Sequence, residues 1–144
     1  MKTMLANAIA FAADKHNGQF DRGGMPYILH TLRVMSFVKS DDLELMAIAV
    51  LHDVVEDCNV TYEDLRALGM SERVVKGVHA LTKFPGVSDE EYLKQITNCP
   101  DAIKVKLADL RHNSDIRRLK GITDKDVARM KKYHAMYLIL KDLV

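Results

Sequence analysis

The sequence predicts an all-α protein, folded as a single bundle of about seven or eight helices. Apolar residues recur at the three- and four-residue spacing of amphipathic helices along most of the chain. Side chains that cap helix N-termini precede several of these stretches. A length of 144 residues fits one domain, which buries about 70% of its unfolded surface and needs no covalent staple. We therefore expect one domain over residues 1–144.

The composition is that of an ordinary globular protein and narrows the range of partners. Hydrophobic residues make up 48% and charged residues 28%, which argues against disorder. Lys plus Arg number 21 and Asp plus Glu number 20, so the net charge of +1 gives no broad attraction to nucleic acid or to an anionic membrane. No apolar run reaches 18 residues, so we expect no transmembrane helix. A local basic patch for a small phosphorylated ligand is still allowed.

The two cysteines bear on the cellular compartment. Cys58 and Cys99 are too few for a disulfide scaffold, and their separation matches no zinc-finger spacing. A reduced, cytoplasmic location is therefore the expectation. Nothing in the sequence indicates an oligomeric state.

The first predicted helix covers residues 3–16 and begins with an apolar run that could be mistaken for a signal peptide. Asn7 interrupts that run, charged residues follow it at once, and its apolar residues share one helical face. We therefore expect an ordinary helix. Three glycines and a proline make residues 17–26 a loop.

Two helices, over residues 27–38 and 42–57, follow this loop. Beyond them, the N-cap residues Thr61, Ser71 and Ser88 each open a further helix. The last of these matches a capping box, with a glutamate three residues after the cap. The resulting helices are 61–69, 71–82 and one that begins at 88, after a turn at 84–86.

The segment 102–110 has an ambiguous pattern. Its first half alternates apolar and polar residues, as a strand does. A lone strand would have no pairing partner in a helical chain, so we favour a helix from Asp101 to Ser114. A long final helix covers about residues 123–143, and no internal repeat or low-complexity tract divides the chain.

The predicted helix over 42–57 carries the main functional signal. It is apolar on every side, which is typical of a central helix packed all round. Its C-terminal half nevertheless holds His52, Asp53, Glu56 and Asp57, which helical spacing places on adjoining faces. Buried unpaired charges cost several kcal/mol, and a bound divalent cation would remove that cost. The alternative is a helix end that emerges into solvent, where Glu56 and Asp57 are simply hydrated.

Further ligands are expected from other segments. His30 and Asp109 are each set among apolar residues, although either could be a buried side chain with its hydrogen bonds satisfied. Two imidazole nitrogens and two carboxylate oxygens leave open positions on a six-coordinate metal, and this donor set suits Mn²⁺, Fe²⁺ or Zn²⁺. Such a metal can activate water and polarise a phosphoryl oxygen. Glu56 and Asp57 would then orient the water or shuttle protons.

Four blocks of the sequence together form a specific pattern. They are His16-Asn17-Gly18-Gln19, Gly24-Met25-Pro26-Tyr27-Ile28-Leu29-His30, His52-Asp53-Val54-Val55-Glu56-Asp57, and Lys106-Leu107-Ala108-Asp109 with Asn113. These blocks, in this order, resemble the HD-domain phosphohydrolases. The nearest branch is the hydrolase domain of RelA/SpoT proteins and the small alarmone hydrolases, including the metazoan SpoT homologue. The resemblance spans about residues 5–140.

The resemblance implies an all-α HD fold and a divalent metal, usually Mn²⁺. It implies that the metal is held by four residues, namely His30, His52, Asp53 and Asp109. It also implies that Glu56 and Asp57 activate water. The family reaction removes the 3′-pyrophosphate of (p)ppGpp, and the metazoan branch is also associated with removal of the 2′-phosphate of NADPH.

The resemblance also suggests residues that contact the substrate. Asn113 matches a substrate-contacting asparagine, and Arg129 and Tyr133 match side chains that reach the nucleotide phosphates. Lys83 is a looser match, and Arg22 can face phosphate. For Lys83, Arg129 and Tyr133 the alternative is a solvated surface.

Two positions depart from the family pattern. RelA/SpoT hydrolases carry two adjacent basic residues in the glycine-rich loop, the first of which packs on guanine, whereas this chain has Asp21-Arg22. Asp21 offers no cation to a base, which leaves the guanine assignment open. The usual Glu-Asp-Thr is Glu56-Asp57-Cys58. No synthetase domain follows Val144, so we expect no (p)ppGpp synthesis.

The sequence thus predicts a metal-dependent phosphohydrolase of a phosphorylated nucleotide, with (p)ppGpp as the leading substrate. Two alternatives stay open. One is an HD phosphatase for another nucleotide, such as NADPH, or for a sugar phosphate. The other is a non-catalytic nucleotide-binding module, against which Glu56 and Asp57 argue because binding alone needs no water-activating pair.

Overall fold

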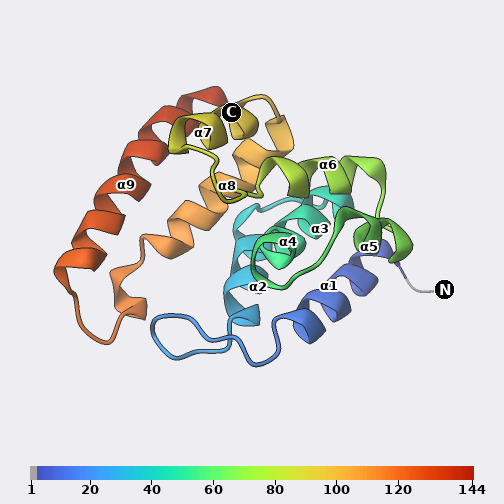
Figure 1. Cartoon of the computed structure of the whole chain (residues 1–144), viewed down its shortest axis with the longest axis horizontal. Coiled ribbons are helices and arrows are strands. Elements are labelled where there is room, and N and C mark those ends of the chain that lie inside the picture. The colour runs from blue at the N-terminus through green and yellow to red at the C-terminus, as the bar shows by residue number, and fades with distance from the viewer. Residues whose placement is uncertain (1–2) are drawn as a thin grey trace.

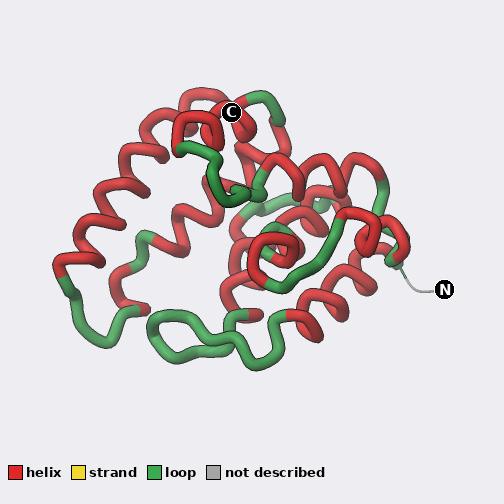
Figure 2. The backbone as a smooth tube through the Cα atoms, viewed as in Figure 1, coloured by secondary structure: helices red, strands yellow, loops and turns green. Residues whose placement is uncertain are grey.

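The computed structural model describes residues 3–144, which form an all-α fold (Figures 1 and 2). The predicted fold class is confirmed, while the first two residues of the predicted domain lie outside the described part. Within residues 3–144, extended pairing is limited to one bridge between Phe20 and Pro26. The helices are α1 (Met4–Lys15), α2 (Ile28–Phe37), α3 (Leu43–Leu51), α4 (Val54–Asp57), α5 (Tyr62–Ala67), α6 (Glu72–Ala80), α7 (Asp89–Thr97), α8 (Pro100–Asn113), α9 (Asp124–Leu140) and the 3-10 helices η1 (Ile116–Arg118) and η2 (Lys141–Leu143).

Side-chain caps fix the helix starts that the sequence predicts. Thr61, Ser71 and Ser88 each accept a hydrogen bond from the backbone N–H three residues on, at the starts of α5, α6 and α7. A reciprocal capping box forms at Thr61 and at Thr123, whereas at Ser88 the partner Glu91 contributes its backbone N–H. The segment of ambiguous pattern lies in α8, so its helical interpretation is confirmed.

Helix α3 is the central helix, as its apolar character on every side predicts. It packs against α1, α2, α6 and α8, and Figure 1 shows α6 on one side of it and α1 on the other. Five consecutive residues of α3, from Ala47 to Leu51, are fully buried. Gly77 lets α6 approach this helix closely, because a Cβ atom there would lie 2.5 Å from Cδ1 of Ile48. The close contact makes α3 a rigid support for whatever its C-terminal end carries.

The helix predicted over 42–57 is divided into α3 and α4, which raises the number of α-helices to nine in residues 3–144. The division falls at His52 and Asp53. The imidazole Nδ1 of His52 lies 2.6 Å from the backbone oxygen of Ala49 and donates to it, and Asp53 has φ −105° and ψ −4°. The side chain of His52 thus binds a carbonyl at the end of α3. The apolar periodicity continues across this point, so the pattern alone gives no sign of the break.

A cleft of about 480 Å³ opens above the junction of α3 and α4. Its walls come from the loop that precedes α2, from α4 and α8, and from η1 and α9. Among residues 3–144, no helix combines the length and the apolar character that crossing a membrane requires. The fold therefore places the polar end of the central helix at the floor of an open cavity.

Candidate metal centre and active site

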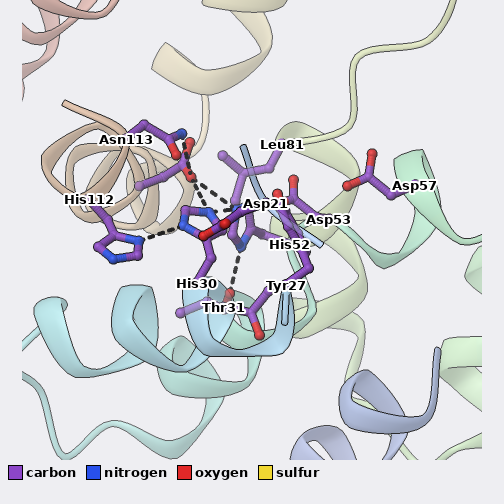
Figure 3. Close-up of polar contacts among 12 residues, drawn as sticks. Asp21, Tyr27, His30, Thr31, His52, Asp53, Asp57, Leu81, His112 and Asn113 are labelled. Carbon is purple, nitrogen blue, oxygen red and sulfur yellow. Dashed lines mark hydrogen bonds and ion pairs between the residues drawn. The ribbon is translucent and has the colours of Figure 1, made fainter. Parts of the chain in front are cut away.

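Four side chains from three parts of the bundle converge beside the cleft, and all but the buried His30 line it. His30 comes from α2, His52 and Asp53 join α3 to α4, and Asp109 comes from α8. One ligand atom of each lies within 4.8 Å of the others. Nε2 of His30 is 2.9 Å from Oδ1 of Asp109, and Nε2 of His52 is 3.0 Å from Oδ2 of Asp53. Figure 3 shows the labelled members of this group pointing toward one another.

Hydrogen bonds outside the group fix the tautomers of its two histidines. Because Nδ1 of His52 donates to Ala49, Nε2 carries the lone pair whenever the ring is neutral, and this buried atom has no hydrogen-bond partner in residues 3–144. Nδ1 of His30 lies 2.7 Å from Nδ1 of His112. Burial and the nearby Arg118 lower the pKa of His112 to about 4, so its ring is neutral and accepts from His30. In its neutral form, each histidine would therefore present the lone pair of Nε2 to the centre.

The two carboxylates are also held from outside the group. The hydroxyl of Tyr27 donates to Oδ2 of Asp53 at 2.5 Å, and the Lys106 ammonium donates to Oδ2 of Asp109 at 3.0 Å. Burial opposes ionisation of both acids, but His52 lowers the pKa of Asp53 to about 2. Lys106 holds the pKa of Asp109 well below its usual range. Both acids are thus carboxylates, which offer oxygen ligands.

The charge balance of this group calls for a cation. Burial disfavours a charged His52, yet Asp53 and Asp109 outweigh burial and raise the pKa of His52 well above its ordinary value. The two carboxylates therefore attract either a proton or a metal ion. The orphaned Nε2 of His52, together with a donor set of two nitrogens and two carboxylates, fits a divalent metal. These four residues can hold such an ion.

Two further carboxylates stand at the edge of the cleft, on α4. Oε1 of Glu56 accepts the backbone N–H of Lys83 at 2.7 Å, and Oδ2 of Asp57 accepts from Nε2 of Gln19 at 3.2 Å. Partial burial, followed by the charge of Asp53, raises the pKa of both acids. Each carboxylate is thus tethered by one neutral N–H donor, and both line the cleft. Carboxylates of raised pKa beside a metal site suit proton transfer.

Comparison with known proteins identifies the family. The HD domain family matches residues 8–131, which is most of the chain. The chain belongs to the HD-domain family. A search of solved structures matches this HD domain to one described as a metazoan ortholog of SpoT that hydrolyzes ppGpp, with a TM-score of 0.81 and 21% identity over 97% of this chain and 86% of that one. At this identity the match shows the shared fold.

Curated relatives of the HD domain carry alarmone names. A Vibrio cholerae protein named guanosine-3′,5′-bis(diphosphate) 3′-pyrophosphohydrolase is 34% identical over 87% of this chain, which covers 19% of that protein. A Danio rerio protein named guanosine-3′,5′-bis(diphosphate) 3′-pyrophosphohydrolase MESH1 is 33% identical over 76% of this chain and 67% of its own length. The chain spans about a fifth of the length of the bacterial relatives. The family resemblance seen in the sequence is confirmed.

The HD domain brings most of the expected substrate contacts to the cleft. Arg22, Asn113, Arg129 and Tyr133 all line it. Asn113 also donates to Oδ1 of Asp109 at 3.1 Å. Lys83 differs from expectation, because its side chain is not part of the cleft lining and its ammonium pairs with an aspartate at the start of α7. What Lys83 brings to the site is its backbone N–H, which binds Glu56.

Four residues that support the site received no role in the sequence analysis, although all but the last stand in the family-like blocks, namely Gln19, Tyr27, Lys106 and His112. Each binds a predicted ligand or catalytic carboxylate. Helical spacing could have identified two of them, since Lys106 and His112 lie three residues either side of Asp109 on α8. Gln19 and Tyr27 reach across long sequence separations, which a spacing argument does not see.

The departure at Asp21 has a structural explanation in the HD domain. Oδ1 of Asp21 accepts the backbone N–H groups of Gly23 and Met25, each at 2.9 Å, and Oδ2 lies 3.1 Å from the Arg118 guanidinium. A Cβ atom at Gly23 would lie 2.1 Å from the backbone oxygen of Arg118, so the loop and η1 are in close contact. Asp21 thus fastens the loop to η1 and neutralises one cation of the cleft.

Proposed function

We propose that the chain is a metal-dependent phosphohydrolase that removes the 3′-pyrophosphate from (p)ppGpp. The observation that supports the proposal is the placement of two tethered carboxylates, Glu56 and Asp57, in a cleft beside four side chains that could together hold a metal ion. The names of the curated relatives support the choice of substrate. The expected cytoplasmic location is part of the same proposal.

We assign the metal to His30, His52, Asp53 and Asp109, with Mn²⁺ as the proposed ion and Fe²⁺ or Zn²⁺ as alternatives. When bound, such an ion supplies Lewis-acid stabilisation of the charge that develops on a phosphoryl oxygen. The protein would hold the ligands in place through Tyr27 and Lys106, whose bonds to the two carboxylates exist before any ion arrives.

The chain's own residues would perform the proton transfer and bind the substrate. A carboxylate of Glu56 or Asp57 accepts a proton from water, whose oxygen forms the new bond to phosphorus. The bond between phosphorus and the ribose O3′ breaks, and that oxygen takes up a proton. Arg22 and Arg129 would neutralise phosphate charge, and Asn113 and Tyr133 would contact the nucleotide. Glu56 accepts the backbone N–H of Lys83 with one carboxylate oxygen, and Asp57 accepts the side-chain amide of Gln19 with one. The second oxygen of each carboxylate is left for water.

A second candidate function is the hydrolysis of a nucleotide with fewer phosphates, such as removal of the 2′-phosphate from NADPH. The observation that favours it is the pairing of the cleft cations with carboxylates. Arg118 is paired with Asp21, and Arg129 is paired with Asp126. A substrate with many phosphates must compete with these carboxylates for its counter-charges.

The experiment is a substrate panel assayed after removal of metal and reconstitution with Mn²⁺, Fe²⁺ or Zn²⁺. The panel contains ppGpp, NADPH, other nucleotides and sugar phosphates. We expect about one metal per chain and release of pyrophosphate from ppGpp, and Asp53→Ala should abolish both metal and activity. If the metal-loaded protein leaves every compound of the panel intact, the proposed enzymatic activity is refuted. Full metal occupancy in Asp53→Ala would refute the assignment of the metal ligands.

A further inference from the structure

The proposed chemistry leaves one polar cluster beside the cleft without a role. His16 ends α1, and Gln19 lies three residues on, in the loop before α2. Nδ1 of His16 is 2.8 Å from Oε1 of Gln19, and Nε2 of Gln19 is 3.2 Å from Oδ2 of Asp57. The three side chains form a line that runs from the buried end of α1 to the edge of the cleft.

The direction of the hydrogen bonds along this line is fixed. An ionised carboxylate only accepts, so the Gln19 amide must turn its nitrogen toward Asp57. Its oxygen then faces His16 and accepts, which places a proton on Nδ1 of the imidazole. A rotated Gln19 amide would set two acceptors against each other at the Asp57 end. Each member of the line therefore holds the next in one orientation.

His16 is built into the fold as an anchor for this line. Its side chain is buried, and its ring packs against Tyr27 with the ring centroids 5.0 Å apart. Its Nε2 is buried and has no hydrogen-bond partner in the described part of the chain. Burying an imidazole with one unpaired nitrogen costs free energy that an apolar residue of the same size would not cost. What the imidazole provides, and such an apolar residue could not, is the hydrogen bond to Gln19.

The backbone of Gln19 is also held at both ends. Its N–H donates to the backbone oxygen of His16 at 3.0 Å, and its own oxygen accepts the N–H of Tyr27 at 2.9 Å. The Gln19 side chain thus projects from a fixed point and reaches Asp57 across 38 residues of sequence. The other Asp57 oxygen accepts no hydrogen bond from residues 3–144. Figure 3 shows Asp57 at one end of the group of site residues, with His112 at the other.

We propose that Gln19, oriented by His16, is a positioning residue that holds Asp57 with one oxygen free to accept a proton from water. The inference rests on the proposed function, because it assigns Gln19 and His16 to the water-activating carboxylate of that reaction. The two carboxylates of α4 differ in the group that holds each of them. The tether of Glu56 is a backbone N–H, whereas the tether of Asp57 is a side chain that substitution can remove.

The test begins with Gln19→Met, which keeps the length of the side chain and removes its hydrogen bonds. We expect kcat for ppGpp to fall about 10- to 100-fold, with KM within twofold and metal content unchanged. His16→Leu should reproduce the loss, and His16→Asn should recover part of it because an asparagine amide can donate near the position of Nδ1. Gln95→Met is the matched control, since Gln95 is also half-buried and its Nε2 donates to the backbone oxygen of Thr82 at 3.1 Å, away from the cleft lining.

A double substitution tests whether Gln19 acts through Asp57. Adding Gln19→Met to Asp57→Asn should cause no further loss of kcat, because the group that Gln19 positions is already gone. An additive loss, or an unchanged kcat in Gln19→Met, would overturn the inference. Crystal structures of the wild type and Gln19→Met provide a readout independent of activity. A rotated Asp57 supports the inference, and an unmoved Asp57 refutes it even if the wild type proves inactive on ppGpp and the proposed function fails.

Discussion

The hydroxyl of Tyr27 lies 2.5 Å from Oδ2 of Asp53 and donates a hydrogen bond to it. Burial, with Asp53 beside it, raises the pKa of Tyr27 far above its ordinary value, so the phenol stays a donor at every physiological pH. The residue at the start of α2 therefore orients a carboxylate of the candidate metal centre at the end of α3. Contacts of this kind fix the direction of a ligand oxygen before an ion binds.

Tyr27→Phe should weaken metal binding about 10- to 100-fold, because it removes the bond that orients Asp53 while it keeps the ring. A competition titration of Mn²⁺ against a chelating dye measures the change. Tyr137→Phe is the matched control, since Tyr137 is exposed on α9. Equal affinities in wild type and Tyr27→Phe would show that the phenol does not support the centre.

Lys106→Met should destabilise the metal-free protein by about 3 kcal/mol, because it leaves the buried Asp109 carboxylate without its 3.0 Å partner. Urea unfolding of metal-free protein measures this loss. Metal-loaded protein should lose less, since a bound cation would neutralise the same carboxylate. Lys104→Met, at an exposed position of the same helix, is the control. A loss no larger than that of the control would contradict the pairing.

Asp21→Asn should change the dependence of stability on pH. Although its burial acts in the other direction, hydrogen bonds from Met25 and Arg118 lower the pKa of Asp21 from its ordinary value of 3.8. A lowered pKa in the folded state stabilises the protein fully above about pH 4, and this stabilisation disappears as the pH falls through the folded-state value. Wild type should therefore exceed Asp21→Asn in unfolding free energy at pH 7, and the difference should shrink as the pH falls below about 4. A constant difference across this range would exclude the ionised Asp21 as the source.

Gly77→Ala should lower the free energy of unfolding by about 1 to 3 kcal/mol, because the new methyl group would overlap the side chain of Ile48. Thermal and urea unfolding measure the loss. Ile48→Val removes the closest atom, so the double substitution should cost less than the sum of the two single ones. Strict additivity would mean that the two helices move apart rather than collide at this contact.

Much of the fold follows from the sequence because its signals are local. The caps at Thr61, Ser71 and Ser88 and the all-round apolar helix at the centre each depend on residues a few positions apart. The division at His52 does not follow from periodicity, since it depends on a side chain that takes up a carbonyl of its own helix. The four candidate ligands meet as expected, although their metal-binding role stays a prediction.

The supporting contacts of the site were less accessible to sequence reasoning. Lys83 contributes through its backbone N–H, a group that every residue except proline carries, so its residue type held no information about this role. Gln19 and Tyr27 reach their carboxylates over 38 and 26 residues of chain. Such pairs are set by how helices pack, and only the folded chain shows which polar neighbours orient which ligand.

The pairing of His30 with Asp109 spans 79 residues of sequence and has a consequence for biosynthesis. A ribosome releases His30, His52 and Asp53 early, but the fourth donor emerges only when α8 is made. The growing chain therefore cannot complete the centre until residue 109 has left the exit tunnel. Capture of an ion by all four donors must therefore wait for the synthesis of α8, well after α2 and α3 have been made.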